Sequence, residues 1–372
     1  MIRHPVRIGA LCVGLLAMLT TSVTADSTPT AHPAAAPSAP LPYTTSNHTI
    51  DAGDGVTLEA RLFSPTSAPA PWPTIITVSG SGPDESLQDP YTRLLLDVWC
   101  RAGIAVLTFN KRGVGHSSGT ATESDFDQRA SDVLAVARYA RGMPGVDAHG
   151  LGLWGISQAG WVLPKAVAID SNFAFLVMVS PPGVSPARQV QFYLEGEFRG
   201  LGLSPKQASD AALLFDRIGR YYASGIGADS VQRAITAVAA QPWYVKAEKH
   251  PFWHDMAAPG RVFTPSELPA AIQAKPADFA WTSAPSTYAD YAADYRSIRV
   301  PTLIIYGGRD ALVPIALSQA EYDHAFRASG YSDVRFHTFP NGDHDIQISI
   351  RAVETGYREM IRDFVLAHAP RR

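Results

Sequence analysis

The sequence predicts an α/β fold in which helices cover both faces of a mostly parallel sheet, with a helical insertion late in the chain. Short apolar, β-branched runs recur along the chain, as expected of strands that are buried on both faces. Helical patterns lie between most of these runs, and alternating strands and helices form open, mostly parallel sheets. A break in this alternation, at residues 182–299, marks the insertion. With 46% hydrophobic and 17% charged residues, the 372-residue chain can bury a large core, which excludes wholesale disorder.

The first 25 residues have the pattern of a secretory signal peptide. Two arginines precede an apolar run, residues 8–19, and Val23 and Ala25 occupy the two positions that a signal peptidase reads. A membrane anchor is the alternative, but a helix over this run is only about 18 Å long, whereas the hydrocarbon core is about 30 Å thick. We therefore expect cleavage after residues 1–25, export to the periplasm or the medium, and no stable membrane anchor.

Residues 26–42 form a linker rich in Ala, Pro, Ser and Thr, a composition that cannot bury enough surface to fold.

Cleavage removes Cys12 and leaves Cys100 as the one cysteine of the mature chain, so no intramolecular disulfide can form. Cys100 follows an apolar helical run, and we expect it to pack as a small hydrophobic residue rather than to serve as a reactive thiol.

The predicted core consists of two parts, residues 43–181 and 300–372. Alternating polar and apolar residues around Asp54 and Gly55 predict a hairpin at its start. Buried strands are predicted at residues 74–78, 104–109, 151–154, 173–179, 302–306 and 334–339. Helices are predicted at residues 91–102, 126–141, 161–169 and 315–328.

The insertion, residues 182–299, shows helical stretches and loops without a convincing buried strand, and we interpret it as a helical cap. It contains most of the aromatic residues that lie in helical patterns. Most of these are expected to form the cap's own hydrophobic core, and a few to face a ligand. They are Phe192, Tyr193, Phe198, Phe215, Tyr221, Tyr222, Trp243, Tyr244, Phe252, Trp253, Trp281 and Tyr288.

Ser157 is the predicted nucleophile. The buried strand at residues 151–154 runs directly into Gly-Ile-Ser-Gln-Ala-Gly and then into a helix, which is the strand–turn–helix context of a nucleophile elbow. Such a serine has strained backbone geometry, and the residues two before and two after it must be small where strand and helix approach each other. Gly155 and Ala159 meet this requirement, although Gly-x-Ser-x-Ala departs from the usual Gly-x-Ser-x-Gly.

A serine hydroxyl needs a base to remove its proton, and a histidine oriented by an acid can be that base. Asp310 and His344 each follow a predicted strand, and open α/β sheets gather their chemistry at the carboxyl ends of the strands. We predict that His344 is the base and Asp310 the acid that orients it. Asp343 and Asp345 are alternative acids, disfavoured because they adjoin the histidine. Free histidine titrates near pH 6.5, so we expect kcat/KM to fall on the acid side with an apparent pKa of about 6–7.

A Gly-rich loop, residues 79–83, follows the strand at residues 74–78. Acyl transfer needs N–H donors directed at the developing oxyanion. We predict the backbone N–H of Ser81 as the first donor of this oxyanion hole, with Gly82 as the alternative, and the N–H of Gln158 as the second. The other interpretation of the loop is a plain turn. A phosphate cradle is disfavoured because the P-loop pattern is missing.

Net charge argues against a nucleic-acid interface, and histidine spacing argues against a metal site. A net charge of −3 leaves no broad basic surface, so nucleic acid is not an expected partner. His250 and His254 have the spacing of a zinc pair, but Pro251 between them disfavours a helix interior and no glutamate accompanies them. We therefore expect neither a metal ion nor a cofactor.

Several of these segments together resemble the α/β-hydrolase superfamily, in particular its bacterial serine aminopeptidase-like and acyl-esterase branch. The matching segments are residues 79–83, 110–117, 155–160, 308–310 and 342–344, within a resemblance that spans about residues 48–372. The resemblance implies the α/β-hydrolase fold with a helical cap after the sixth strand, and the chain order Ser, Asp, His.

This chain departs from the superfamily pattern at two positions, and neither departure removes a catalytic atom. Ser79 stands where a histidine is common, and Ala159 replaces a glycine. Superfamily members that cleave carbon–halogen bonds or epoxides use an aspartate nucleophile, so Ser157 argues against both reactions. Proline iminopeptidases usually carry tryptophan where Gln158 stands.

We expect an exported serine hydrolase that forms an acyl-enzyme on a small-molecule substrate, foremost small apolar acyl esters. The second interpretation is an aminopeptidase or dipeptidyl peptidase acting on short peptides. Such an enzyme usually needs a cap carboxylate for the substrate's α-amino group, and Glu195 and Glu197 are the candidates, although two exposed helix acids explain them equally well. The third interpretation is an inactive hydrolase-like binding module, which a serine-directed fluorophosphonate would not label.

Overall fold

A computed structural model describes residues 40–83, 85–120, 125–254, 260–274 and 284–369, and its centre is an eight-stranded sheet. The strands are β1 (Tyr43–Asp51), β2 (Thr57–Pro65), β3 (Trp72–Val78), β4 (Ala105–Phe109), β5 (Val146–Ile156), β6 (Leu176–Val179), β7 (Thr302–Gly307) and β8 (Val334–Phe339). The predicted signal peptide, residues 26–39 of the predicted linker, and Trp281 of the predicted cap lie outside the described residues.

The strands follow the order β1-β2-β4-β3-β5-β6-β7-β8 across the sheet. The hairpin of β1 and β2 is antiparallel and joins β4 in an antiparallel pairing, whereas all pairs from β4 to β8 are parallel. The prediction of a mostly parallel sheet is therefore confirmed. Because β3 and β5 to β8 run the same way, their carboxyl ends lie at one edge of the sheet, and the loops that follow them gather there.

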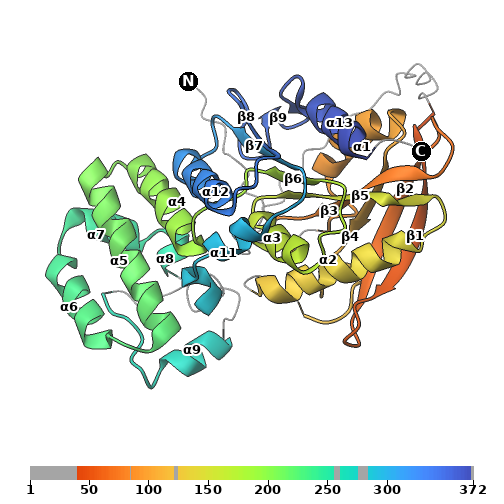
Figure 1. The fold of residues 1–372 in the computed structure, drawn as a ribbon. Helices are drawn as coiled ribbons and strands as arrows, with labels where there is room; N and C mark the ends of the chain where they lie inside the picture. The colour runs from red at the N-terminus through yellow and green to blue at the C-terminus, as the bar shows by residue number, and fades with distance from the viewer. Residues whose placement is uncertain (1–39, 84, 121–124, 255–259, 275–283, 370–372) are drawn as a thin grey trace, which may run out of the picture.

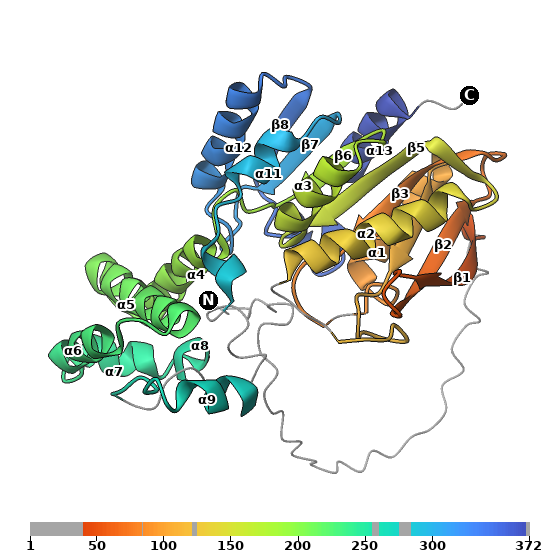
Figure 2. The same ribbon diagram turned by 60° about the horizontal axis from the view of Figure 1, so that its bottom comes forward.

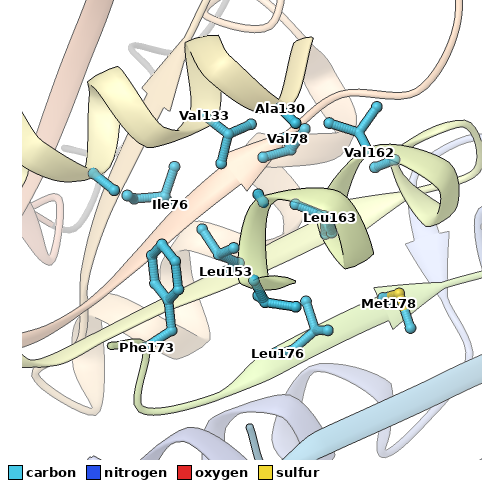
Figure 3. Packing of buried hydrophobic residues seen from close by; sticks show 14 of the residues in the cluster. Ile76, Val78, Ala130, Val133, Leu153, Val162, Leu163, Phe173, Leu176 and Met178 are labelled. Carbon is cyan, nitrogen blue, oxygen red and sulfur yellow. The ribbon is translucent and has the colours of Figure 1, made fainter. Parts of the chain in front are cut away.

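Helices cover both faces of the sheet (Figure 1). The helices α1 (Pro90–Arg101) and α13 (Tyr357–His368) pack on one face, and α2 (Phe126–Arg141), α3 (Ala159–Ile169) and α12 (Ile315–Ser329) on the other. Alternate residues of each strand contribute to the two faces; Ile76 joins the α2–α3 side and Ile75 the α1–α13 side. Figure 3 shows side chains of α2 and α3, such as Val133 and Leu163, packed against those of β3, β5 and β6.

Local sequence signals account for where α1 begins. The Asp89 carboxylate caps α1 by accepting from the N–H groups of Tyr91 and Thr92, and Pro90 opens the helix at a position that needs no N–H donor.

Cys100, near the end of α1, is fully buried, and burial raises its pKa to about 12. The expectation that Cys100 packs as a hydrophobic residue is therefore confirmed.

The helices directly after β6 lie to one side of the sheet (Figure 2). They are α4 (Pro186–Gly200), α5 (Pro205–Ser224), α6 (Ala228–Val238), α7 (Pro242–Glu248), α8 (Pro251–His254) and α9 (Leu268–Ala274). Their buried residues form a hydrophobic cluster of their own, separate from the two clusters beside the sheet. Six of the predicted cap aromatics are buried in it: Phe198, Phe215, Tyr221, Tyr222, Tyr244 and Trp253.

The other described residues of 182–299, the stretch assigned to the cap, pack partly against the cap and partly against the core. The short 3-10 helix η1 (Pro285–Tyr288) packs against α4 and α5, but α11 (Ala292–Ser297) packs against α3 and α12, and Tyr295 joins the core cluster. A small hairpin of β9 (Gln347–Ser349) and β10 (Ala352–Val353), which was not predicted, precedes α13.

Among the described residues, no helix has both the length and the hydropathy that crossing a membrane requires.

Candidate active site

Ser157 lies in the sharp turn between β5 and α3. Its φ of 56° is the left-handed backbone conformation expected of a nucleophile elbow. The turn is held by the Ser157 N–H, which donates to the Val179 carbonyl at 2.9 Å, and by the Ser157 carbonyl, which accepts from the Gly160 N–H at 2.8 Å. A side chain at Gly155 would place its Cβ only 2.6 Å from the Cβ of Ala159, so strand and helix approach as closely as the sequence pattern predicts.

Asp310 and His344 form a hydrogen-bonded pair at the same edge of the sheet. Asp310 follows β7, and its Oδ2 lies 2.8 Å from Nδ1 of His344, in the loop that follows β8. Its Oδ1 accepts from the N–H groups of Leu312 and Val313 at 2.7 and 3.0 Å, which fixes the carboxylate in place. The Asp310 side chain is fully buried, and that of His344 is 15% exposed. An Nδ1–H that donates to Asp310 leaves Nε2 as the basic nitrogen.

The electrostatic surroundings of His344 differ from those of a free histidine. Burial disfavours the charged imidazolium, but the adjacent carboxylates of Asp310, Asp345 and Asp343 outweigh this effect and raise the pKa of His344 to about 9. The pKa of Asp345 is itself raised, because its carboxyl group is buried among other acids. The prediction of about 6–7 for the acid limb started from a free histidine, and these carboxylates favour a limb at higher pH.

The two alternative acids do not bond to the imidazole. Oδ1 of Asp343 instead accepts from the N–H groups of Asp345 and Gln347, which shapes the loop around His344. Ser180, which follows β6, donates its hydroxyl to the His344 carbonyl at 2.7 Å and so ties this loop to the centre of the sheet. Sequence reasoning missed Ser180, although its place directly after a buried strand was a usable signal.

The loop at residues 79–83 passes directly beside Ser157. A Cβ at Gly80 would lie 3.2 Å from the Ser157 Cβ and 3.8 Å from its Oγ, so a side chain at residue 80 would be in tight contact with the serine. Within the described part of the chain, the backbone N–H of Ser81 has no hydrogen-bond partner. Gln158, the other predicted donor, occupies the N-cap position of α3, where backbone N–H groups and the helix dipole favour an anion.

Two buried cations that sequence reasoning missed contact this loop. Lys111, in the loop after β4, donates its Nζ to the carbonyls of Gly80 (3.1 Å) and Gly82. Arg129, in the first turn of α2, donates to the Ser79 carbonyl at 2.7 Å and to Oε1 of Gln158. Arg129 could have been noticed as a charged residue on the apolar face of a helix; Lys111 could have been noticed beside Arg112 in the segment after a buried strand.

The two cap acids considered for binding an α-amino group both lie on α4 and have partners within the cap. Glu195 accepts from Gln191 at 3.3 Å and from Ser209 at 3.4 Å, and it pairs with Arg199 at 3.6 Å. Glu197 pairs with His250 at 3.6 Å.

In the part of the chain that the structure describes, no group of three or more His, Cys, Asp or Glu side chains could hold a metal ion.

Comparison with known proteins adds a family match and several partial relatives. Residues 54–324 match the family described as X-Pro dipeptidyl-peptidase (S15 family). A thiohydrolase, aneE, of Aspergillus aculeatus is 28% identical over 129 residues, which are 34% of this chain and 39% of that protein. Esterase FrsA of Yersinia enterocolitica is 41% identical over 78 residues, which are 21% of this chain and 18% of the esterase. The chain thus spans less than half the length of these curated relatives.

Solved structures share the fold. A proline iminopeptidase of Mycobacterium smegmatis superimposes with a TM-score of 0.53 at 17% identity, over 87% of this chain and 99% of that one. Esterase Pf2001 of Pyrococcus furiosus superimposes with a TM-score of 0.54 at 16% identity, over 88% and 93% of the two chains. Identities this low establish a common architecture and leave the chemistry to the residues of the site.

Proposed function

The chain belongs to the X-Pro dipeptidyl-peptidase (S15) family and is a hydrolase of the α/β-hydrolase superfamily, and from this premise we propose that it is a serine esterase that acts on small apolar acyl esters. In this proposal Ser157 is the nucleophile, His344 the general base, and Asp310 the acid that orients the base. The N–H groups of Ser81 and Gln158 form the oxyanion hole. The finding that carries the proposal is the buried Asp310–His344 pair, at the edge of the sheet where Ser157 occupies a left-handed turn.

The proposed reaction has two balanced halves. Oγ of Ser157 attacks the substrate's carbonyl carbon while its proton moves to Nε2 of His344, and the carbonyl oxygen becomes an oxyanion that accepts from the two backbone N–H groups. The tetrahedral intermediate then expels the alcohol, which takes the proton from His344 and leaves an acyl-enzyme. Water repeats the sequence with His344 as base, releasing the carboxylic acid and restoring the Ser157 hydroxyl.

The contacts that Glu195 and Glu197 make within the cap support an ester substrate over an amide. An α-ammonium group would have to displace the hydrogen bonds that Glu195 makes to Gln191 and Ser209, or the contact between Glu197 and His250. An ester makes no such demand, and its alcohol is a better leaving group than an amine. The family match favours the second candidate, a dipeptidyl peptidase acting on short peptides.

The choice between the two candidates can be tested with matched substrates on the purified protein. We expect p-nitrophenyl esters of short to medium acyl chains to have kcat/KM values at least about tenfold above those of aminoacyl and X-Pro anilides, a gap of about 1.4 kcal/mol in transition-state stabilisation. Faster turnover of an X-Pro anilide would replace the esterase proposal with the peptidase. Ser157→Ala, measured in parallel, corrects for hydrolysis that does not depend on the site.

We also propose that the protein is exported, on the basis of the N-terminal sequence pattern alone. Two arginines, the apolar run at residues 8–19 and Ala25 match a cleavable secretory signal. The test is mass spectrometry of the N-terminus in fractionated cells of the native host. Mature protein outside the cytoplasm that begins at Asp26 would support export; full-length protein in the cytoplasm would contradict it.

A further inference from the structure

We infer that Arg129 and Lys111 are positioning residues that set the direction and donor strength of the oxyanion-hole N–H groups, an inference that rests on the proposed function. Each is a buried cation, with 7% and 8% of its surface exposed, respectively. A buried cation is unfavourable unless hydrogen-bond acceptors surround it. Here the acceptors include three backbone carbonyls of one short loop, those of Ser79, Gly80 and Gly82.

Peptide geometry converts these contacts into a direction for the N–H groups. In a trans peptide, the carbonyl of one residue and the N–H of the next point in opposite directions. The Ser79 carbonyl faces Arg129, so the Gly80 N–H points away from Arg129. The Gly80 carbonyl faces Lys111, so the Ser81 N–H points away from Lys111. The two cations therefore hold the carbonyl side of the loop and leave its donors on the other side.

The position of the loop gives this direction a consequence for catalysis. Gly80 lies beside Ser157: a Cβ added to Gly80 would be 3.8 Å from Oγ of Ser157. Donors of this loop are therefore next to the reacting atoms. Arg129 also holds the side chain of Gln158, whose N–H is the second proposed donor. One guanidinium thus links the two halves of the oxyanion hole, which come from the loop after β3 and the turn after β5.

The positive charges have a second effect on the same groups. A carbonyl that accepts a hydrogen bond from a cation is polarised, and the polarisation extends through the peptide to make the attached N–H a stronger donor. The effect is larger where the groups are shielded from water, as Lys111 and Arg129 are. Orientation and polarisation both favour the transition state, in which the substrate oxygen carries its negative charge, more than the bound ester.

The test is steady-state kinetics of Arg129→Met and Lys111→Met with p-nitrophenyl butyrate, together with inhibition by 1-butaneboronic acid, whose adduct with Ser157 mimics the tetrahedral oxyanion. We expect each substitution to lower kcat by roughly 10- to 100-fold with KM within about threefold, and the Ki of the boronic acid to rise by the factor that kcat/KM loses. Arg141→Met is the matched control, because Arg141 lies on the same helix and also bridges two acceptors, Asp170 and Asn172, away from the site. It should keep kcat within about twofold.

Three results decide the inference. A kcat within about threefold of wild type in both variants, or a lower kcat with an unchanged Ki for the boronic acid, overturns it while leaving the esterase in place. If wild type and Ser157→Ala are equally inactive and neither binds the boronic acid, the proposed function fails and the inference fails with it. Should Arg129→Met prove unfolded by circular dichroism, Arg129→Lys replaces it, with an expected kcat between those of wild type and Lys111→Met.

Discussion

The sheet and the cap differ in what they bury. In the described part of the core beside the sheet, five charged residues are buried: Lys111, Arg112, Arg129, Asp132 and Asp310. Among the described cap residues, the buried polar side chains are the uncharged Gln191 and Thr287, and the rest of the buried interior is aliphatic and aromatic. The ion pairs of α5 lie toward solvent, as in Lys206–Asp210.

This difference indicates a division of roles. Burying a charge is costly and is compensated only by well-placed partners, whereas an exposed ion pair contributes about 0–1 kcal/mol. The core uses its buried charges to fix groups at the edge of the sheet, as Asp310 does for His344. The cap uses aromatic packing to hold its own shape. We therefore expect changes in the core to act on turnover and changes in the cap to act on stability and substrate choice.

The largest expected effect comes from breaking the buried pair in the core. Asp310→Asn keeps the size of the side chain but removes the charge that holds and stabilises the imidazolium, so kcat should fall by roughly 10⁴-fold. Asp343→Asn is the matched control in the neighbouring loop, because asparagine retains the oxygen that accepts from Asp345 and Gln347. Purified, folded Asp310→Asn with turnover within tenfold of wild type would remove Asp310 from the mechanism.

The next largest effect should be on the stability of the cap. Phe198 is fully buried on α4 beside His250 and Trp253, so Phe198→Ala should lower the free energy of unfolding by about 3–5 kcal/mol through lost packing and a cavity. Urea denaturation measures this change. Phe192→Ala, on the exposed side of the same helix, should cost less than about 1 kcal/mol. The division of roles would be wrong if folded Phe198→Ala lost turnover as completely as Asp310→Asn.

A smaller effect is expected in the pH dependence of kcat/KM. The proposed mechanism needs neutral His344, and nearby carboxylates raise its pKa to about 9, so activity should still be rising with pH above 7. Asp345→Asn removes one of these negative charges, which disfavours the imidazolium and moves the acid limb to lower pH. Each half unit of this shift raises kcat/KM at pH 7 about threefold. A wild-type profile that is flat from pH 6 to 9, or a limb that Asp345→Asn moves to higher pH, would contradict this expectation.

The smallest effect should follow from changing a cap acid. Glu195→Gln keeps hydrogen-bonding capacity toward Gln191 and Ser209 and loses a charge away from the reacting atoms, so ester kcat/KM should stay within about twofold of wild type. The same variant assayed with an aminoacyl anilide reports on the alternative substrate. A selective rise in KM for the anilide would show that Glu195 holds an α-amino group, and the cap would then take part in recognition by charge.

The fold could be predicted from the sequence because its signals are local. Parallel strands buried on both faces leave continuous apolar runs, and the predicted strands at residues 302–306 and 334–339 match β7 and β8 to within one residue. The elbow could be predicted because the close approach of β5 and α3 requires small residues at positions 155 and 159. The hairpin of β9 and β10 was missed, since strands of three and two residues carry almost no periodicity.

The rest of the candidate site depends on contacts between segments that are distant in the sequence. Lys111 and Arg129 could have been noticed as charged residues in apolar surroundings, but their partners are known only once the loop after β3 folds over them. The pKa of His344 depends on where three carboxylates lie around one imidazole, which spacing along the chain does not determine. The sequence therefore indicated the proposed reacting residues, whereas the contacts that hold them and the charges around them required the structure.

Intact-protein mass spectrometry after treatment with a fluorophosphonate tests whether Ser157 is the activated nucleophile. We expect one adduct per molecule of wild-type protein, mapped by proteolysis to Ser157, and a much slower reaction in His344→Ala because the hydroxyl loses its base. Folded Ser157→Ala should remain unlabelled. An adduct on another residue, or no adduct on folded wild-type protein, would contradict the account, and the second result would favour a binding module that lacks catalysis.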